Sequence, residues 1–321
     1  MKYNPAPETA ELLTWMLRKI KSVPYGVSLR WAFYQAVQEK GLQKNDYANV
    51  KKYTSKARKS FWNGWRPDTL IDDTRTIYKA GHGYDSFSEW LNSLKKLNPV
   101  YEVFSHQDKI VQIWFEAQAM YSQFDHYASP YRISLVPFKG DTSIHHKWKI
   151  GAEYLAALYE RYRKPIVVLY FGDYEPFSDR GSRAKGITIP LSALADIIPY
   201  FLRMLGNKGI LTADEIQDII NNERTEEWIK FVRVGLNQEH VEKWHLPENP
   251  ERPGEYQWEA LGDEHAQKLI TGAIEQYWDA DVIREIEEKE EADTKKWQKI
   301  IDDAIKRFEA DENGDGVNDS T

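Results

Sequence analysis

The chain has 321 residues and a formal net charge of −7, with 41% hydrophobic and 29% charged residues. This length and balance are typical of a soluble globular protein with room for two domains. The sequence contains no cysteine, which excludes disulfides, zinc–thiolate sites and cysteine nucleophiles. No run approaches the roughly 20 apolar residues of a membrane helix, and the first residues lack the apolar core of a signal peptide. We therefore expect a cytoplasmic protein without membrane contact.

The charge is distributed unevenly along the chain. Residues 1–70 hold 13 Lys and Arg against 5 Asp and Glu, whereas residues 281–321 hold 7 against 14. A basic end on an acidic chain favours one domain that faces nucleic acid. The alternative is a chance distribution of charge.

Three helices are predicted near the N-terminus, over residues 8–21, 29–40 and 46–61, with Ser28 as the N-cap of the second. The inner face of the third is formed by Tyr47, Val50, Thr54, Ala57 and Phe61. Its other side carries the candidate DNA-binding residues Lys51, Lys52, Arg58 and Lys59. Turn signals follow, so the pattern predicts a winged-helix domain over residues 1–105 whose third helix reads the major groove of double-stranded DNA. The alternative is any small helical domain with a solvated basic face.

From residue 106 strands and helices alternate. Strands are predicted at 110–115, 132–138, 165–171 and 230–234, and helices at 117–128, 144–162, 188–205, 212–222, from 237 and at 262–278. Thr212 and Glu215 have the spacing of a capping box. This order predicts an α/β domain with a mostly parallel, doubly wound sheet over residues 106–279. A charged helix is expected over 280–310, followed by a disordered acidic tail over 311–321.

Acidic residues follow two of the predicted buried strands. Glu116 comes directly after 110–115, and Asp173 and Glu175 come after 165–171. Because open parallel sheets bind ligands beyond the carboxyl ends of their strands, we expect these carboxylates to converge. Carboxylate oxygens suit Mg²⁺, or Mn²⁺ in its place. The alternative is a set of strand-end acids that cap helices or face water.

Tyr34 follows the predicted buried residue Phe33 and shares a polar stripe with Arg30 and Gln38. A phenol with a pKa of about 10 is a poor nucleophile at neutral pH. A cation one helical turn away, or a nearby metal, favours the reactive phenolate. The residues alone favour a boundary tyrosine that packs its ring and leaves its hydroxyl in water.

Taken together, these regions resemble the A subunit of type IIB topoisomerases (topoisomerase VI) and its relatives that make meiotic double-strand breaks. Closer still, they resemble the short stand-alone A-like proteins of prokaryotes and their viruses. The matching segments cover about residues 25–275 and are Leu29-Arg30-Trp31-Ala32-Phe33-Tyr34, 47–58, 71–75, 111–116, Gly172-Asp173-Tyr174-Glu175-Pro176, 231–236, 246–250 and 258–261. The first matches the family's tyrosine-bearing helix, and the strand-end Glu with the Gly-Asp segment matches its Toprim metal site.

The resemblance implies a winged-helix domain followed by a Toprim domain, and a tyrosine that attacks DNA. Tyr34 would form a 5′-phosphotyrosyl link, with Arg30 orienting the phosphate or stabilising the phenolate. Mg²⁺ would be held by Glu116, Asp173 and Glu175. Of these three, Glu116 is also expected to be a catalytic residue, together with Tyr34 and Arg30. Cutting both strands takes two tyrosines, which predicts a homodimer. The sequence has no Gly-x-x-x-x-Gly-Lys-Ser/Thr loop, so any use of ATP needs a separate ATPase subunit.

The sequence departs from the family pattern at three places. Glu175 replaces the second Asp of the Asp-x-Asp pair, Phe177-Ser178 replaces Ser-Gly, and Ala117 replaces a frequent Lys. Two alternatives to the transesterase therefore stay open. One is a Toprim-type nuclease that uses water, with Tyr34 only structural. The other is a catalytically inactive DNA-binding or regulatory relative.

Overall fold

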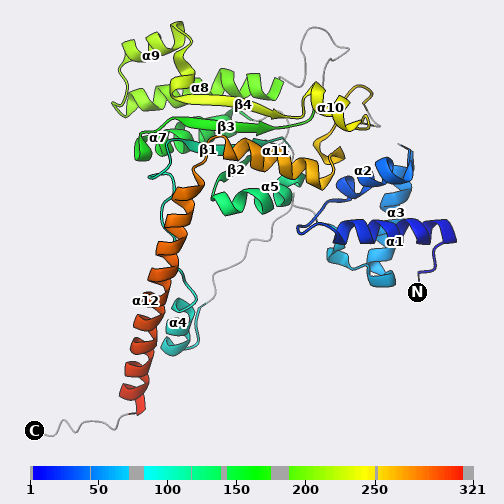
Figure 1. The fold of residues 1–321 in the computed structure, drawn as a ribbon, viewed down its shortest axis with the longest axis horizontal. Coiled ribbons are helices and arrows are strands. Elements are labelled where there is room, and N and C mark those ends of the chain that lie inside the picture. The colour runs from blue at the N-terminus through cyan, green and yellow to red at the C-terminus, as the bar shows by residue number, and fades with distance from the viewer. Residues whose placement is uncertain are drawn as a thin grey trace, which may run out of the picture. The chain divides into compact units, whose positions relative to one another are not determined.

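The computed structural model shows an α/β protein with a four-stranded, wholly parallel sheet (Figure 1). It describes residues 3–43, 45–71, 83–116, 118–138, 143–174, 188–249 and 252–313; over 188–194 and 311–313 it describes the backbone alone. The chain divides into two compact units. The first unit comprises Met1–Arg75 and Asp108–Trp278, and the second unit comprises Thr76–Gln107 and Asp279–Thr321.

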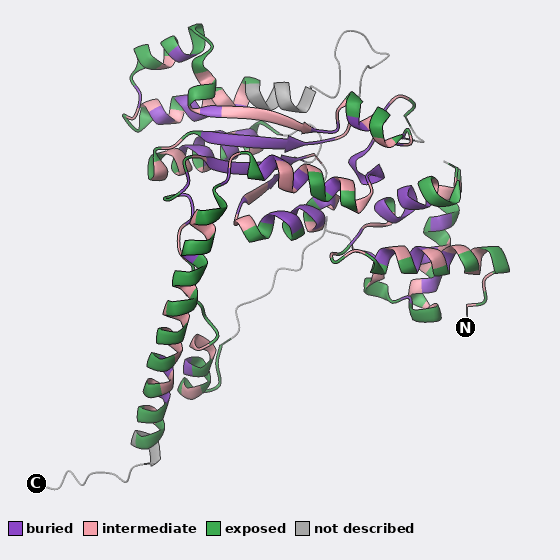
Figure 2. Cartoon of the chain, in the orientation of Figure 1, coloured by how far each residue is buried: buried purple, intermediate pink, exposed green. Residues whose placement is uncertain are grey.

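The sheet of the first unit has the strand order β2-β1-β3-β4. Its strands are β1 (Ile110–Phe115), β2 (Ser134–Pro137), β3 (Ile166–Phe171) and β4 (Ile229–Gly235). Every residue of β1 and β3 is buried, as expected of central strands covered on both faces (Figure 2). Phe115 pairs with Phe171 at the end of the β1–β3 ladder. The two central strands therefore end side by side, which places Glu116 next to the turn that follows β3.

The helices around the sheet follow the predicted order. They are α5 (Tyr121–Ala128), α6 (Ile144–Trp148), α7 (Ala156–Tyr162), α8 (Thr188–Asn207), α9 (Ala213–Asn221), α10 (Gln238–Trp244) and α11 (Asp263–Glu275). A π-helical stretch, Lys149–Leu155, joins α6 to α7. A Cβ atom on Gly151 would lie 2.5 Å from the carbonyl oxygen of Ile197, so the glycine allows α8 to pack closely on this stretch. Thr212 and Glu215 form the predicted capping box.

Strand β2 is shorter than the predicted span of 132–138. Arg132 has a left-handed backbone with φ of 56° and ends a 3-10 turn, so the extended conformation begins only at Ser134. The parallel order of the sheet is unaffected, because β2 still pairs along β1 from Gln112 to Phe115.

Three helices precede the sheet: α1 (Pro7–Lys21), α2 (Leu29–Lys40) and α3 (Asp46–Lys59). They enclose a core that includes Leu13, Met16, Trp31, Phe33, Val50, Ala57 and Trp65. The Ser28 hydroxyl accepts a hydrogen bond from the amide of Trp31 at 3.2 Å, which confirms the predicted N-cap of α2.

The end of the third helix differs from the prediction. Helix α3 ends at Lys59, and Phe61 beyond it has a left-handed backbone and is 65% exposed rather than part of the inner face. Two 3-10 turns follow, Trp62–Gly64 and Pro67–Thr69, and no strand occurs between α3 and residue 71. Residues 72–82, where a wing would fall, lie outside the described residues. The three predicted helices are present, and the winged-helix assignment stays a prediction.

The second unit is built from α4 (Phe87–Leu94) and α12 (Ala280–Asn313). Leu91 and Leu94 of α4 pack against Trp297, Ile301, Ile305 and Phe308 of α12. Residues 83–105 therefore group with the C-terminal helix, whereas the sequence placed them with the N-terminal helices. Helix α12 continues past its predicted end at 310, and 314–321 of the predicted tail lie outside the described residues. None of the helices in the described part of the chain is both long and apolar enough to cross a membrane.

Candidate functional site

Two of the three predicted metal-binding residues, Glu116 and Asp173, are neighbours at the carboxyl end of the sheet. The amide of Glu116 donates to the carbonyl oxygen of Phe171 at 3.1 Å, which continues the β1–β3 ladder past the strands. The Glu116 carboxylate in turn accepts a hydrogen bond from the amide of Asp173 at 3.1 Å. Glu175 lies outside the described residues, so its predicted role stays untested.

Asp173 is held from two sides. Its Oδ1 accepts a hydrogen bond from the amide of Trp258 at 2.8 Å, and its carbonyl oxygen accepts one from the Arg233 guanidinium at 2.8 Å. Trp258 itself is 1% exposed, and its ring stacks on Phe124 with a centroid distance of 5.5 Å. The position of the Asp173 carboxylate is therefore fixed by the core of the domain.

Arg233 is a residue of this site to which the sequence pattern assigned no role. It lies on β4, and its guanidinium also donates to the carbonyl oxygen of Leu236 at 3.0 Å and to Asn237 Oδ1 at 3.3 Å. It therefore ties the turn after β4 to the turn after β3 and places a positive charge at the backbone of Asp173. In the sequence, only the position of Arg233 near the end of a predicted strand points to this role. That position becomes informative once β4 is known to lie next to β3 in the sheet.

The chemistry of the paired side chains fits a divalent metal ion. Glu116 and Asp173 offer hard carboxylate oxygens, which are the ligands that Mg²⁺ and Mn²⁺ prefer, and Mg²⁺ commonly adds water and phosphate oxygens to one or two carboxylates. No group of three or more His, Asp or Glu side chains arranged for a metal occurs among the residues that the structure describes. The donor set from these residues is thus the pair, Glu116 and Asp173.

Tyr34 is buried, with 3% of its side chain exposed. The sequence placed it on a polar flank of its helix. In the structure its hydroxyl donates to Gln257 Oε1 at 2.6 Å. The cause is the packing of α2 against residues 257–261, where Gln35 and Gln38 of α2 also donate to the carbonyl oxygens of Leu261 and Ala260. Arg30, one turn before Tyr34, is exposed.

The dipeptide Gln257-Trp258 connects the tyrosine with the carboxylates. The side chain of Gln257 accepts the hydrogen bond from Tyr34, and the amide of Trp258 donates to Asp173. Tyr34 and Asp173 therefore contact one short segment of the same chain. This segment is the 3-10 turn η8 (Trp258–Ala260) with the residue before it.

Glu259 is a buried carboxyl group in the same turn, 5% exposed. Burial raises its pKa above the ordinary value, and the opposite charge of Arg30 on α2 acts in the other direction. A raised pKa means that the folded protein binds this proton more tightly than the unfolded chain. The stabilisation from this proton is thus fully present below the pKa of Glu259 in the unfolded chain, about 4.3. It is lost as the pH rises through the pKa of Glu259 in the folded protein.

We expect the substitution Glu259→Gln to stabilise the protein at pH 7 to 8, because burial disfavours the charged form of this carboxyl group and an amide has no charged form. The gain should shrink as the pH falls toward 4.5. Urea unfolding of both proteins across this range measures it. A variant that is less stable than the parent at pH 8 would show that the Glu259 carboxylate is needed in its charged form.

The candidate DNA-binding side chains lie on α3. Lys51, Lys52 and Lys59 are exposed, as is Lys56, which the prediction omitted. Arg58 is half-buried, and its Nε has no hydrogen-bond partner in the described part of the chain. The helix therefore presents lysines to solvent from Lys51 to its C-terminal end.

Comparison with known proteins gives no relative: the chain matches no family model, no curated protein and no solved structure.

Proposed function

We propose that this chain cleaves duplex DNA in a reaction that depends on a divalent cation, with the Tyr34 hydroxyl as the attacking group. The observation that carries the proposal is the meeting of Glu116 and Asp173 at the ends of two adjacent parallel strands. In support, the candidate nucleophile contacts the segment that positions Asp173. The proposal assigns the three N-terminal helices to a winged-helix domain and the sheet to a Toprim domain, as the resemblance to topoisomerase VI A subunits implies.

The proposed reaction is a transesterification. The Tyr34 oxygen forms a bond to phosphorus, and the bond between phosphorus and the 3′ oxygen of the neighbouring nucleotide breaks. The phenol loses its proton and the 3′ oxygen gains one, which leaves a 5′-phosphotyrosyl link. Glu116 and Asp173 would hold a Mg²⁺ ion, and such an ion neutralises charge that develops on the phosphate and the leaving oxygen. Arg30 would orient the phosphate, and Tyr34 must leave the buried position described above before it can react.

Incubation with supercoiled plasmid and Mg²⁺, followed by protease treatment and gel electrophoresis, tests the proposal. A transesterase gives nicked or linear DNA that enters the gel fully only after the protease has removed the attached protein. Plasmid that stays supercoiled, with and without Mn²⁺ in place of Mg²⁺, would contradict it and favour the inactive DNA-binding relative.

A hydrolytic nuclease is the second candidate, and the burial of Tyr34 favours it. A side chain that is 3% exposed and hydrogen-bonded to Gln257 cannot reach a phosphate in this conformation. In this alternative a water molecule attacks, Tyr34 is structural, and the same carboxylates hold the cation. The plasmid assay distinguishes the two, because hydrolysis leaves no protein on the DNA.

The exposed lysines of α3 lead to a separate prediction about binding. Reversing the charge of Lys51, Lys52 and Lys59 together should weaken binding to duplex DNA about 100-fold or more at 0.1 M salt. The slope of log affinity against log salt should fall by about 0.9 for each phosphate that the variant no longer neutralises. A matched control is Lys96→Glu with Lys149→Glu and Lys243→Glu, three lysines that are also exposed and lie outside α3. Fluorescence anisotropy with a labelled duplex measures both, and equal affinities for both variants would remove α3 from the DNA interface.

A further inference from the structure

The second unit exposes an unusual share of large apolar side chains. Such residues are exposed at ten places in the described chain, and six of these lie in the second unit, which contributes only residues 83–107 and 279–313. They are Tyr84, Phe87, Trp90, Leu97, Val100 and Ile300. Apolar side chains that gather on the surface of a folded protein, where they form a continuous patch, usually mark a binding surface.

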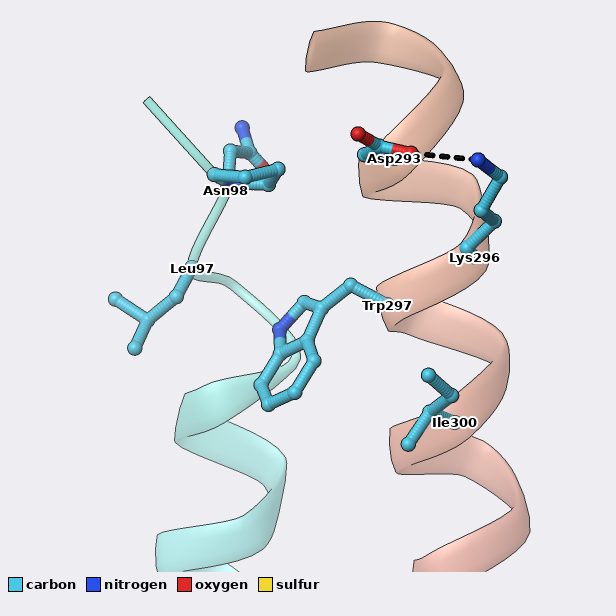
Figure 3. Close-up of a pocket in the computed structure, with 7 residues that line it drawn as sticks. Leu97, Asn98, Asp293, Lys296, Trp297 and Ile300 are labelled. Atoms are coloured by element: carbon cyan, nitrogen blue, oxygen red, sulfur yellow. Dashed lines mark hydrogen bonds and ion pairs between the residues drawn. The ribbon is translucent and has the colours of Figure 1, made fainter. Parts of the chain in front are cut away.

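Two open grooves lie between α12 and the segment that follows α4. One is lined by Leu97, Asn98 and Pro99 and, across from them, by Asp293, Lys296, Trp297 and Ile300 (Figure 3). The Trp297 ring points from α12 toward the Leu97 segment, and its Nε1 donates to the carbonyl oxygen of Leu94 at 3.0 Å. Ile300, one turn along, is 59% exposed. The packing of α4 thus leaves an apolar part of the α12 surface uncovered.

The second groove continues this surface toward the start of α12. Its lining includes Tyr101 and His106 on one side and Val282, Glu285, Ile286 and Lys289 on the other. Together the lining residues of α12 lie at positions 282, 285, 286, 289, 293, 296, 297 and 300, so each turn of the helix contributes one or two of them. That spacing defines a single helix face, which we name the groove face.

The charges of α12 are segregated along its length. Residues 281–293 contain seven acidic and two basic residues, a net charge of −5, whereas 294–307 contain five basic and two acidic residues, a net charge of +3. Two parallel copies of α12 would oppose like charges along their whole length. Two antiparallel copies would set the acidic half of each against the basic half of the other, and charges flanking a helix seam decide partner and orientation in this way.

We propose that the groove face binds a second copy of this chain, with the two α12 helices antiparallel about a two-fold axis near Ala292. This position lies at the change of charge sign and, along the helix, between the two grooves. A two-fold interface uses the same surface on both partners, as one self-complementary helix requires. Glu285 and Lys299 lie seven residues on either side of the axis, so each Glu285 faces the Lys299 of the other copy. The interface does not depend on the proposed DNA cleavage and is tested without DNA.

Cysteine cross-linking of the full chain tests the geometry, because the natural sequence has no cysteine. Ala292→Cys should cross-link to itself with a short bis-maleimide. Glu285→Cys and Lys299→Cys should cross-link to each other when the two proteins are mixed, and neither to itself. Self-cross-linking of Glu285→Cys would mean a parallel pair and would overturn the antiparallel interface. No cross-link at any of the three positions would overturn the interface itself.

Sedimentation velocity tests the energetics of the interface, with variants that reverse a charge or replace an apolar side chain by lysine. Glu285→Lys and Lys299→Glu should each weaken the dimer at least about 5-fold, and the double variant should restore it. Neither residue forms an ion pair among the described residues, so the charge changes break no ion pair there within one copy. Ile300→Lys should dissociate the dimer, whereas Ile220→Lys on α9, at a site 48% exposed, should not. A parent protein that is monomeric at tens of micromolar, or a double variant weaker than either single one, would overturn the proposal.

Discussion

Tyr34→Phe should abolish the protein–DNA adduct, reducing its yield at least about 1,000-fold, because the phenylalanine ring has no oxygen to attack phosphorus. The variant should still bind duplex DNA, since the lysines of α3 are unchanged. Removing the hydroxyl leaves Gln257 Oε1 without the hydrogen bond that it accepts at 2.6 Å, which should cost about 1 kcal/mol of unfolding free energy. Radiolabelled DNA that stays with the protein after denaturation measures the adduct directly.

Tyr154→Phe is a closely matched control. The hydroxyl of Tyr154 also donates to a glutamine side chain, Gln112 Oε1, at 2.7 Å, so its removal should cost a similar amount of stability. It should leave the adduct yield within about two-fold of the parent. If Tyr34→Phe still cuts at the parent rate and no adduct forms with either protein, Tyr34 is structural and the protein is a hydrolytic nuclease.

The second large effect concerns the carboxylate pair. Asp173→Asn and Glu116→Gln should each lower the rate of DNA cleavage at least about 100-fold, because each removes a negative charge from the proposed cation site while keeping the shape of the side chain. The amide side chain introduced by Asp173→Asn retains an oxygen that can accept the hydrogen bond from the Trp258 amide, so the fold should be preserved. Plasmid cleavage rates at several Mg²⁺ concentrations provide the measurement.

A control for the loss of charge alone is Glu160→Gln. Glu160 forms an ion pair with Lys208 at 2.6 Å, and both side chains are substantially exposed, so neutralising it should change stability and cleavage little. Parent-like cleavage by both Asp173→Asn and Glu116→Gln would remove the pair from the reaction. Any stabilisation of the reacting phosphate would then have to come from residues elsewhere in the chain.

Local patterns in the sequence were enough to predict most of the fold. The spacing of apolar residues predicted α2, Ser28 predicted its N-cap, and the spacing of Thr212 and Glu215 predicted the capping box of α9. Each feature depends on residues within a few positions of one another. The apolar runs 110–115 and 165–171 predicted two buried parallel strands, and strand order then brought Glu116 to Asp173. These features follow from short-range periodicity and from the rule that parallel strands end at one edge.

The remainder depends on contacts between distant parts of the chain. The burial of Tyr34 is set by residues 257–261, more than 220 positions away, and no helical pattern in α2 carries that information. The packing of Leu91 on Ile301 and Ile305 likewise joins segments about 200 residues apart. Arg233 became visible as part of the site only through the neighbouring positions of β3 and β4. Long-range pairings of this kind require the three-dimensional structure.

The most direct test of the central claim, that Glu116 and Asp173 form a site for a divalent cation, is a titration with Mn²⁺ followed by electron paramagnetic resonance. The parent protein should deplete the signal of free Mn²⁺, and added Mg²⁺ should restore that signal by competition. The double variant Glu116→Gln with Asp173→Asn should lose this binding while Glu160→Gln keeps it. A parent protein that leaves free Mn²⁺ unchanged, or a double variant that binds as tightly as the parent, would contradict the account.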